Sequence, residues 1–203
     1  MNDTELLVKR AKKKDSSAFE ELVRIHQNRV YALSLQLSGN RDDAQDLAQE
    51  TFIRAYRALD RFRNEADFGT WLHRIAVNAW LNFRRKNGGK QTLSLDEPYK
   101  DEGGSEIQRE IASDDGDPLL ALEEKEFRGL VRVALMELSD EHRTVLVLRE
   151  MEGYSYEEIS RMLECSLGTV KSRLNRAREV MRRKITDLAR ETGEVLPLYE
   201  ERR

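Results

Sequence analysis

The residues with the clearest chemical potential lie in a basic segment near the end of the chain. Residues 168–184 contain seven Lys or Arg side chains and one acidic side chain. At helical spacing, one side of the segment would present Ser172, Asn175 and Arg176, flanked by Lys171 and Arg173. Guanidinium and amide groups form paired hydrogen bonds with base edges, whereas phosphates require only positive charge. We interpret the segment as a DNA-reading helix; the alternative is an ordinary solvated basic helix.

A second, shorter helix and a tight turn are predicted immediately before the basic segment. Ser155 and Glu158 have the spacing of a capping box, which predicts a helix from Ser155 to about Leu163. Its inward side would contain Tyr156, Ile159 and Leu163. The basic helix would begin near Ser166 and bury a stripe of four residues, Val170, Leu174, Ala177 and Met181. A short helix, a turn and a basic helix together predict a helix-turn-helix, whose second helix enters the major groove of DNA.

Composition limits the other possibilities. The chain has 203 residues, 36% of them charged, with a net charge of -3, which excludes a surface that is basic throughout. Its single Cys165 excludes an internal disulfide framework and a cysteine zinc cluster, and we expect no metal and no cofactor. It contains no Gly-rich phosphate loop or nucleophile elbow, so we do not expect an enzyme. Without a signal-type segment or an apolar run of membrane-spanning length, we expect a cytoplasmic protein with no membrane insertion.

The N-terminal half is predicted to form four helices, over residues 4–14, 17–37, 41–59 and 67–86. In the second helix, His26 is expected at the polar edge of the apolar stripe. The third helix has a core stripe and, beside it, the additional apolar residues Phe52, Ile53 and Tyr56. This arc exceeds the roughly 100° that a surface helix needs. It indicates either a protein partner or additional burial in the core.

The loop before residue 68 and the fourth helix combine aromatic and basic side chains. The helix is expected to bury seven residues, with Trp80 at the boundary: Phe68, Trp71, Leu72, Ile75, Ala76, Ala79 and Phe83. Arg74, Asn78 and Arg85 would lie on the other side. Rings that stack on unpaired bases, together with cations that hold the backbone, are typical of single-stranded nucleic-acid sites. Packing of the core explains the aromatic residues equally well.

The periodicity stops between residues 87 and 117, where acidic residues dominate. Nine acidic and two basic residues lie between Leu93 and Pro118, which predicts a flexible acidic linker. We therefore expect an all-α protein of two small helical domains, with boundaries at 1–86, 87–117, 118–190 and a tail at 191–203. In the second domain a helix is expected over 118–138, and Ser139 would cap another whose inward side holds Val145, Leu146, Leu148 and Met151. Beyond Thr186 the chain is expected to fray.

Three stretches, in this order, carry a resemblance to a known family: DLAQETFIRAYRALDRF, FGTWLHRIAVNAWLNFRRK and LSDEHRTVLVLREMEGYSYEEISRMLECSLGTVKSRLNRARE. Together with the acidic spacer, they resemble the extracytoplasmic-function (group IV) sigma factors of bacterial RNA polymerase. The likeness covers residues 5–86 and 118–185. It implies a transcription initiation factor that binds core RNA polymerase, recognises the minus-ten and minus-thirty-five promoter elements and promotes promoter melting, in a stress or envelope response.

The resemblance also implies site residues. Residues matching the sigma region 2 helix that docks on the beta-prime coiled coil of polymerase are Asp46, Gln49, Glu50, Phe52, Ile53, Arg54 and Tyr56. Residues expected to bind the minus-ten element, with a flipped base near Phe62 and Asn78, are Phe62, Arg63, Asn64, Trp71, Arg74, Asn78 and Arg85. Region 4 would read the duplex minus-thirty-five element through Thr169, Lys171, Ser172, Arg173, Asn175 and Arg176, and contact the polymerase beta flap. Some members have an aromatic residue where Asn175 stands, so the base preference there can differ.

The resemblance also implies a further partner, and the residues leave an alternative function open. In family members the linker threads the RNA-exit path of polymerase, and an anti-sigma factor commonly clamps the two domains, so an anti-sigma partner is expected. The alternative function is a stand-alone helix-turn-helix repressor or activator, which would bind duplex operators as a dimer without polymerase. A nucleic-acid enzyme is disfavoured, because the sequence has no carboxylate or His cluster with metal-ligand spacing.

Overall fold

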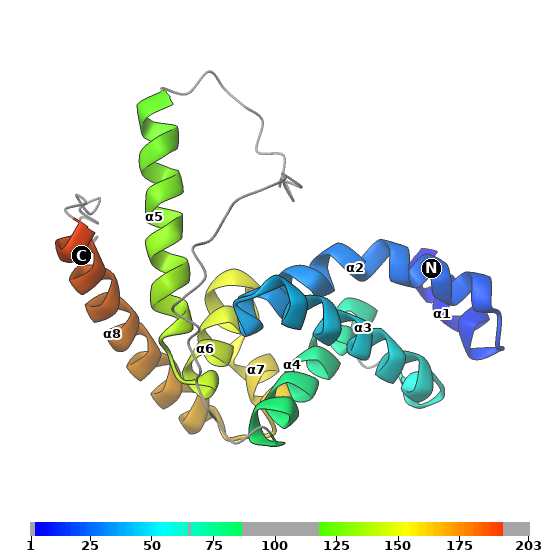
Figure 1. The fold of residues 1–203 in the computed structure, drawn as a ribbon. Helices are drawn as coiled ribbons and strands as arrows, with labels where there is room; N and C mark the ends of the chain where they lie inside the picture. Colours follow the sequence, from blue (N-terminus) through cyan, green and yellow to red (C-terminus); the bar gives the residue numbers. More distant parts are fainter. Residues whose placement is uncertain (1–2, 65, 87–117, 193–203) are drawn as a thin grey trace.

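The computed structural model describes residues 3–64, 66–86 and 118–192, with side chains from residue 127 in the last range. All regular secondary structure in these ranges is helical, which confirms the all-α prediction (Figure 1). The N-terminal helices lie on one side of the molecule, and α5 and α8 extend away from them on the other (Figure 1). The linker of residues 87–117 and the tail beyond residue 192 lie outside the described residues.

The N-terminal region contains α1 (Asp3–Lys12), α2 (Ser16–Ser38), α3 (Arg41–Ala58), a 3-10 turn η1 (Leu59–Arg61) and α4 (Phe68–Lys86). Local chemistry sets the helix ends. Asp15 caps α2 by accepting a hydrogen bond from the Ala18 amide, and Asn40 caps α3 through the Asp43 amide at 2.8 Å. Gly39 ends α2 with a φ of +83°, a left-handed conformation that favours glycine. These caps explain why the predicted helices agree with the observed ones to within a few residues.

The core of the N-terminal region is built from all of these helices and contains an aromatic cluster. Phe62, Phe68 and Trp71 pack with ring centroids 4.9–5.5 Å apart. His26 lies within this core against the edge of Phe68, with centroids 5.4 Å apart. The prediction that His26 sits at a polar edge is therefore wrong, because the start of α4 covers that side of α2.

The C-terminal region contains α5 (Pro118–Met136), α6 (Asp140–Leu146), a π-helical turn η2 (Val147–Met151), α7 (Tyr156–Leu163) and α8 (Leu167–Thr192). The predicted capping box is confirmed, because Ser155 and Glu158 bond each other's backbone amides at 2.8 and 3.2 Å. Met162, on the inward side of α7, is buried while Tyr156 and Leu163 are half-buried. Helix α8 continues to Thr192, so the predicted fraying from Thr186 is wrong. Packing of α8 against α5 buries Ala189 and stabilises the extra turns.

The second half of α6 and the start of η2 are buried on every side. Each residue from Arg143 to Leu148 is buried, although an amphipathic helix would expose some of them. The π-helical turn then changes the helical phase and leaves Met151 46% exposed. The prediction that Met151 points inward is therefore wrong.

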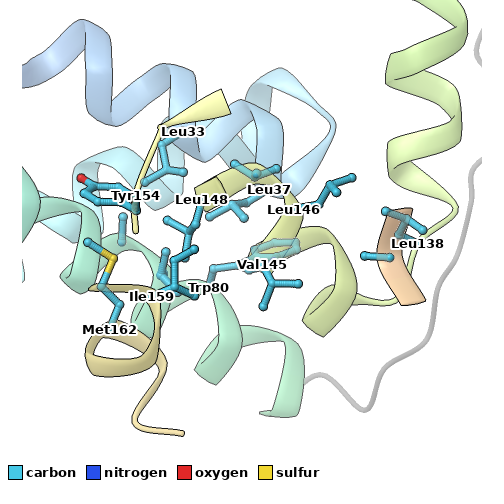
Figure 2. Close-up of a cluster of buried hydrophobic side chains, with 14 of the residues drawn as sticks. Leu33, Leu37, Trp80, Leu138, Val145, Leu146, Leu148, Tyr154, Ile159 and Met162 are labelled. Atoms are coloured by element: carbon cyan, nitrogen blue, oxygen red, sulfur yellow. The ribbon is translucent and has the colours of Figure 1, made fainter. Parts of the chain in front are cut away.

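The two helical regions share one hydrophobic cluster. Figure 2 shows Leu33 and Leu37 of α2 and Trp80 of α4 beside residues of the C-terminal region, among them Val145, Leu148 and Ile159. Two predictions about α4 are corrected by this contact: Trp80 is 3% exposed and Phe83 is 46% exposed, the reverse of the expectation. The C-terminal region covers the Trp80 side of α4, and nothing among the described residues covers Phe83 to a similar degree.

Candidate nucleic-acid and polymerase-binding surfaces

The helix-turn-helix is held by short-range hydrogen bonds around its turn. Glu164 ends α7 in a left-handed conformation with a φ of +51°, and the Ser160 hydroxyl donates to the Cys165 carbonyl at 2.6 Å. The Ser166 hydroxyl accepts a hydrogen bond from the Thr169 amide at 3.1 Å, which caps α8 as predicted. Cys165 is a half-buried free thiol in this turn. The turn therefore fixes the direction in which α8 leaves the protein.

The outer face of α8 presents most of the predicted duplex-reading residues. Lys171, Ser172, Asn175 and Arg176 are exposed, and Val170, Leu174 and Ala177 are buried behind them. Thr169 is half-buried, and Arg173 forms an ion pair with Glu141 at 2.8 Å. The exposed Leu167 and Gly168, in the first turn of α8, were missed by the sequence analysis. The first residues of a recognition helix are those that usually contact bases. The signal available in the sequence was that Leu167 and Gly168 directly follow the capping Ser166.

The predicted minus-ten residues are divided between a cavity and a helix face. A cavity of about 420 Å³ is lined by four of them, Phe62, Arg63, Trp71 and Arg74, together with Thr70, which the sequence analysis missed. The other lining residues include Arg61, Ala66 and Asp67 of the loop and three residues of α7, Glu158, Arg161 and Met162. Asn64 adopts a φ of +56° in the exposed loop, a conformation that asparagine tolerates.

Asn78 and Arg85 continue the line of Arg74 along α4 rather than lining the cavity. The three residues are separated by one and two helical turns, and none of them is buried. Phe62 is itself buried, and its carbonyl accepts a hydrogen bond from the Lys12 ammonium of α1. Phe62 is thus a buried wall of the cavity, while Arg63 and Arg74 supply its exposed charge.

A larger groove lies between α2 and α3. It measures about 980 Å³, and four predicted polymerase-binding residues line it: Gln49, Phe52, Ile53 and Tyr56. Ile53 and Tyr56 are 38% and 48% exposed, so these two residues of the surplus apolar arc are not used for core burial, whereas Phe52 is half-buried against the core. Asp46, Glu50 and Arg54 lie on α3 outside the groove, and Glu50 pairs with Arg54 at 2.7 Å.

The opposite wall of this groove comes from α2 and was missed. Its residues are Phe19, Val23, Gln27, Asn28 and Tyr31. Phe19 contacts Tyr56 edge to face, with centroids 4.9 Å apart. At helical spacing Phe19 and Val23 fall on the same apolar stripe as the buried residues of α2, and only their partial exposure distinguishes them from the core.

Polar groups join the two helical regions beside the shared cluster. The buried Arg143 of α6 donates to the Leu37 carbonyl of α2 at 2.8 Å, and Arg84 of α4 pairs with Asp140 at 2.8 Å. The Tyr154 hydroxyl lies 2.9 Å from Nδ1 of His73. Burial lowers the pKa of His73 to about 4 and also raises the pKa of Tyr154, so a neutral imidazole and a neutral phenol share this hydrogen bond. A carboxylate oxygen of Glu152 lies 3.6 Å from the same nitrogen.

The described residues hold no group of three or more His, Cys, Asp or Glu side chains that could bind a metal ion. A search of the same part of the chain finds no helix that is long and apolar enough to cross a membrane.

Two family models match the chain in the order of the two helical regions. Sigma-70 region 2 matches residues 22–89, and Sigma-70, region 4 matches residues 128–181. The RNA polymerase sigma-H factor of Pseudomonas aeruginosa is 37% identical over 91% of this chain and 95% of its own length. The ECF RNA polymerase sigma factor SigW of Bacillus subtilis is 36% identical, with coverages of 89% and 96%. The ECF RNA polymerase sigma-E factor of Escherichia coli is 38% identical, with coverages of 92% and 96%.

Solved structures show the same fold. The sigma factor RpoE of Bartonella quintana, in complex with the anti-sigma factor NepR, aligns with a TM-score of 0.60 at 24% identity, over 83% of this chain and 96% of RpoE. CnrH, in complex with the cytosolic domain of CnrY, aligns with a TM-score of 0.58 at 24% identity, over 94% and 99% of the two chains. The matches to the two family models span both helical regions. An unrelated repressor would match only in the helix-turn-helix. The chain belongs to the extracytoplasmic-function (ECF) family of sigma-70 factors, non-enzymatic proteins that direct RNA polymerase to promoters.

Proposed function

We propose that the groove between α2 and α3 is the surface that docks on the coiled coil of the polymerase beta-prime subunit. The observation that supports this most directly is the exposure of Ile53 and Tyr56, two large apolar side chains that line a groove on the surface. An amphipathic helix of a partner can place its apolar residues in such a groove. Asp46, Glu50 and Arg54, beside the groove, would supply its polar rim.

The second part of the proposal concerns the minus-ten element. The cavity beside α4 combines aromatic walls with exposed arginines, which suits an unpaired base and its flanking phosphates. Arg74, Asn78 and Arg85 would guide the strand along α4. Holding an unstacked base outside the duplex favours strand separation, and this is how we propose that the chain promotes melting.

The third part concerns the minus-thirty-five element. Helix α8 would enter the major groove with Lys171, Ser172, Asn175 and Arg176 toward the DNA. Arg173 is half-buried and paired with Glu141. It would either break this ion pair to reach a base or contact only the DNA backbone. Contact with the polymerase beta flap would come from the same helical region.

Further partners are proposed from the relatives. Two structural neighbours were solved as complexes, RpoE with the anti-sigma factor NepR and CnrH with the cytosolic domain of CnrY. We propose that this chain has an anti-sigma factor as well, acts in the cytoplasm and serves a stress or envelope response.

The docking surface can be tested with a pair of matched isoleucines. Ile53→Lys places a charge in the groove, whereas Ile25→Lys changes an isoleucine of similar exposure on α2 outside it. We expect Ile53→Lys to weaken binding to core polymerase by about tenfold or more, as for an interface anchor, and to reduce run-off transcription accordingly. Ile25→Lys should behave as the unmodified chain does. Equal affinity of both variants for core polymerase would exclude the groove as the docking surface.

A further inference from the structure

The end of α1 carries a dense run of positive charge that none of the proposed surfaces includes. Five of the six residues from 9 to 14 are Lys or Arg, and none is acidic, in a chain with a net charge of -3. Cations at the end of a helix also interact favourably with the helix dipole, so such a run on its own indicates only a solvated helix end. Its position beside the proposed minus-ten cavity indicates a ligand.

Two lysines fasten this run to the loop that lines the cavity. The Lys12 ammonium donates to the Phe62 carbonyl and lies 5.7 Å from the centre of the Phe62 ring. Lys14 pairs with Asp60 at 3.1 Å. Phe62 lies in the wall of the cavity, between two arginines that also line it. The basic run is therefore continuous with the rim of the cavity.

These residues together form a surface that we call the α1 patch. Residues 9–15 and 60–63 hold seven basic and two acidic side chains. The basic members are Lys9, Arg10, Lys12, Lys13, Lys14, Arg61 and Arg63. Backbone hydrogen bonds hold the turn over residues 13–15, so the main chain that carries these charges has a fixed position. A segregated excess of positive charge of this kind is the electrostatic footprint of a nucleic-acid surface.

The α1 patch keeps most of its charge accessible to a ligand. All of its basic members except Lys12 are exposed. The two acidic members, Asp15 and Asp60, form ion pairs in which the basic side chains, Arg10 and Lys14, are 50% and 72% exposed. Ion pairs exposed to water contribute little to stability, so a phosphate can displace the carboxylates.

We propose that the α1 patch is a further DNA-binding site, which holds the phosphates of the single strand that leaves the minus-ten cavity. The strand would follow α4 on one side of the cavity and leave it on the other across the loop of residues 61–63. A positive surface that follows the backbone is how proteins hold unpaired nucleotides. Phosphates carry no sequence information, so the α1 patch would add affinity for any strand. This inference rests on the proposed minus-ten site.

Neutralising two lysines of the α1 patch tests the proposal. Lys9→Gln combined with Lys13→Gln removes two exposed charges four residues apart and leaves Lys12, which supports the loop, in place. The control combines Arg128→Gln with Arg132→Gln, which removes two exposed charges at the same spacing from α5, at the other end of the molecule (Figure 1). The probe is a fluorescein-labelled oligodeoxythymidylate of about 20 nucleotides, longer than a typical single-strand site. Fluorescence anisotropy measures its affinity for the full chain from about 0.05 to about 0.5 M NaCl.

The expected result is a weaker dependence of affinity on salt in the patch variant. Two lost phosphate contacts make the slope of log affinity against log salt shallower by about 1.4, at about 0.7 per contact, and weaken binding about tenfold at about 0.1 M salt. The control variant should keep the slope of the unmodified chain. Asp60→Asn should bind the probe more tightly, because Lys14 is then released from its ion pair. A purely structural role of the patch would not produce this gain.

Three results would overturn the proposal. The first is an unchanged slope in the patch variant, and the second is an equal loss in the control variant, since net charge alone would then explain the effect. The third is a loss of affinity for core polymerase without a loss of affinity for the probe, which would assign the α1 patch to an acidic protein surface.

Arg74→Gln separates this proposal from the proposed minus-ten site, because Arg74 lines the cavity and lies outside the α1 patch. If Arg74→Gln weakens binding of the probe and the patch variant does not, the cavity stands and only the α1 patch is refuted. If the patch variant weakens binding and Arg74→Gln does not, the assignment of the cavity is wrong. The proposal that one strand joins the two surfaces then falls with it.

Discussion

Replacement of Arg143 should destabilise the protein more than any other substitution of a charged side chain described above. Arg143 is 4% exposed, and its guanidinium donates to four backbone carbonyls: Leu135 at 3.1 Å, Met136 at 2.7 Å, Leu138 at 3.0 Å and Leu37 at 2.8 Å. The first three end α5 and lead into α6, and the fourth lies on α2. One side chain therefore satisfies carbonyls of both helical regions.

The magnitude follows from what the carbonyls lose. Each buried acceptor left without a donor costs about 1–3 kcal/mol, and water that enters the space recovers part of this. We expect Arg143→Met to lower the free energy of unfolding by about 3–5 kcal/mol, a large fraction of the 5–15 kcal/mol typical of a domain. Arg143→Lys should be nearly as harmful, because a single ammonium lacks the planar fork that reaches carbonyls in several directions.

Urea unfolding followed by circular dichroism measures this difference. With a slope of about 1–3 kcal/mol per molar urea, the midpoint should fall by about 1–5 M. Arg132→Lys, at an exposed arginine of α5, is the control and should stay within about 0.5 kcal/mol of the unmodified chain. A loss below about 1 kcal/mol for Arg143→Met would refute the argument, since it would mean that the carbonyls find other donors at little cost.

Three further predictions concern pH, capping and DNA reading. The pKa of His73 is about 4 in the folded protein and 6.5 as its reference value, so its contribution to stability is complete above pH 6.5 and decreases as the pH falls. The free energy of unfolding should fall by about 3 kcal/mol between pH 6.5 and pH 4. If His73→Gln showed the same dependence of this free energy on pH, the assignment to His73 would be contradicted. Ser155→Ala should cost about 1 kcal/mol in thermal unfolding by removing the capping box, while no loss would mean that packing alone starts α7. Arg176→Ala should weaken use of the minus-thirty-five element by about 1–3 kcal/mol, and equal activity across a panel of element variants would exclude a base contact.

Local signals in the sequence were sufficient for the helices and for the helix-turn-helix. The capping box of Ser155 and Glu158 and the cap of Asn40 act within a few residues, so their chemistry can be read without knowing the fold. The exposed face of α8 could be predicted from the helical spacing of its apolar and basic residues. The family resemblance then gave the surplus apolar arc of α3 a function, and the exposure of Ile53 and Tyr56 is consistent with it.

Contacts between distant parts of the chain were not predictable from the same signals. Trp80 and Phe83 are both aromatic and three residues apart, and only the position of the C-terminal region decides which one is buried. Met151 was misplaced because a π-helical turn has no sequence period that separates it from an α-helix. The α2 wall of the polymerase groove was missed because Phe19 and Val23 match a core stripe until a neighbouring helix leaves them partly uncovered.

The burial of the six residues from Arg143 to Leu148 has a consequence for how freely this segment can vary in sequence. Most helices have a tolerant side, so that a saturation scan of substitutions shows effects that rise and fall every 3.6 residues. From Arg143 to Leu148 every residue is at most 7% exposed, so such a scan should lack this 3.6-residue period and report intolerance at six successive positions. After Leu148 the side chains reach the surface again: Arg149 is half-buried and Glu150 is exposed, so tolerance to substitution should return at Glu150. A short helix in the middle of the protein would thus be its least mutable element.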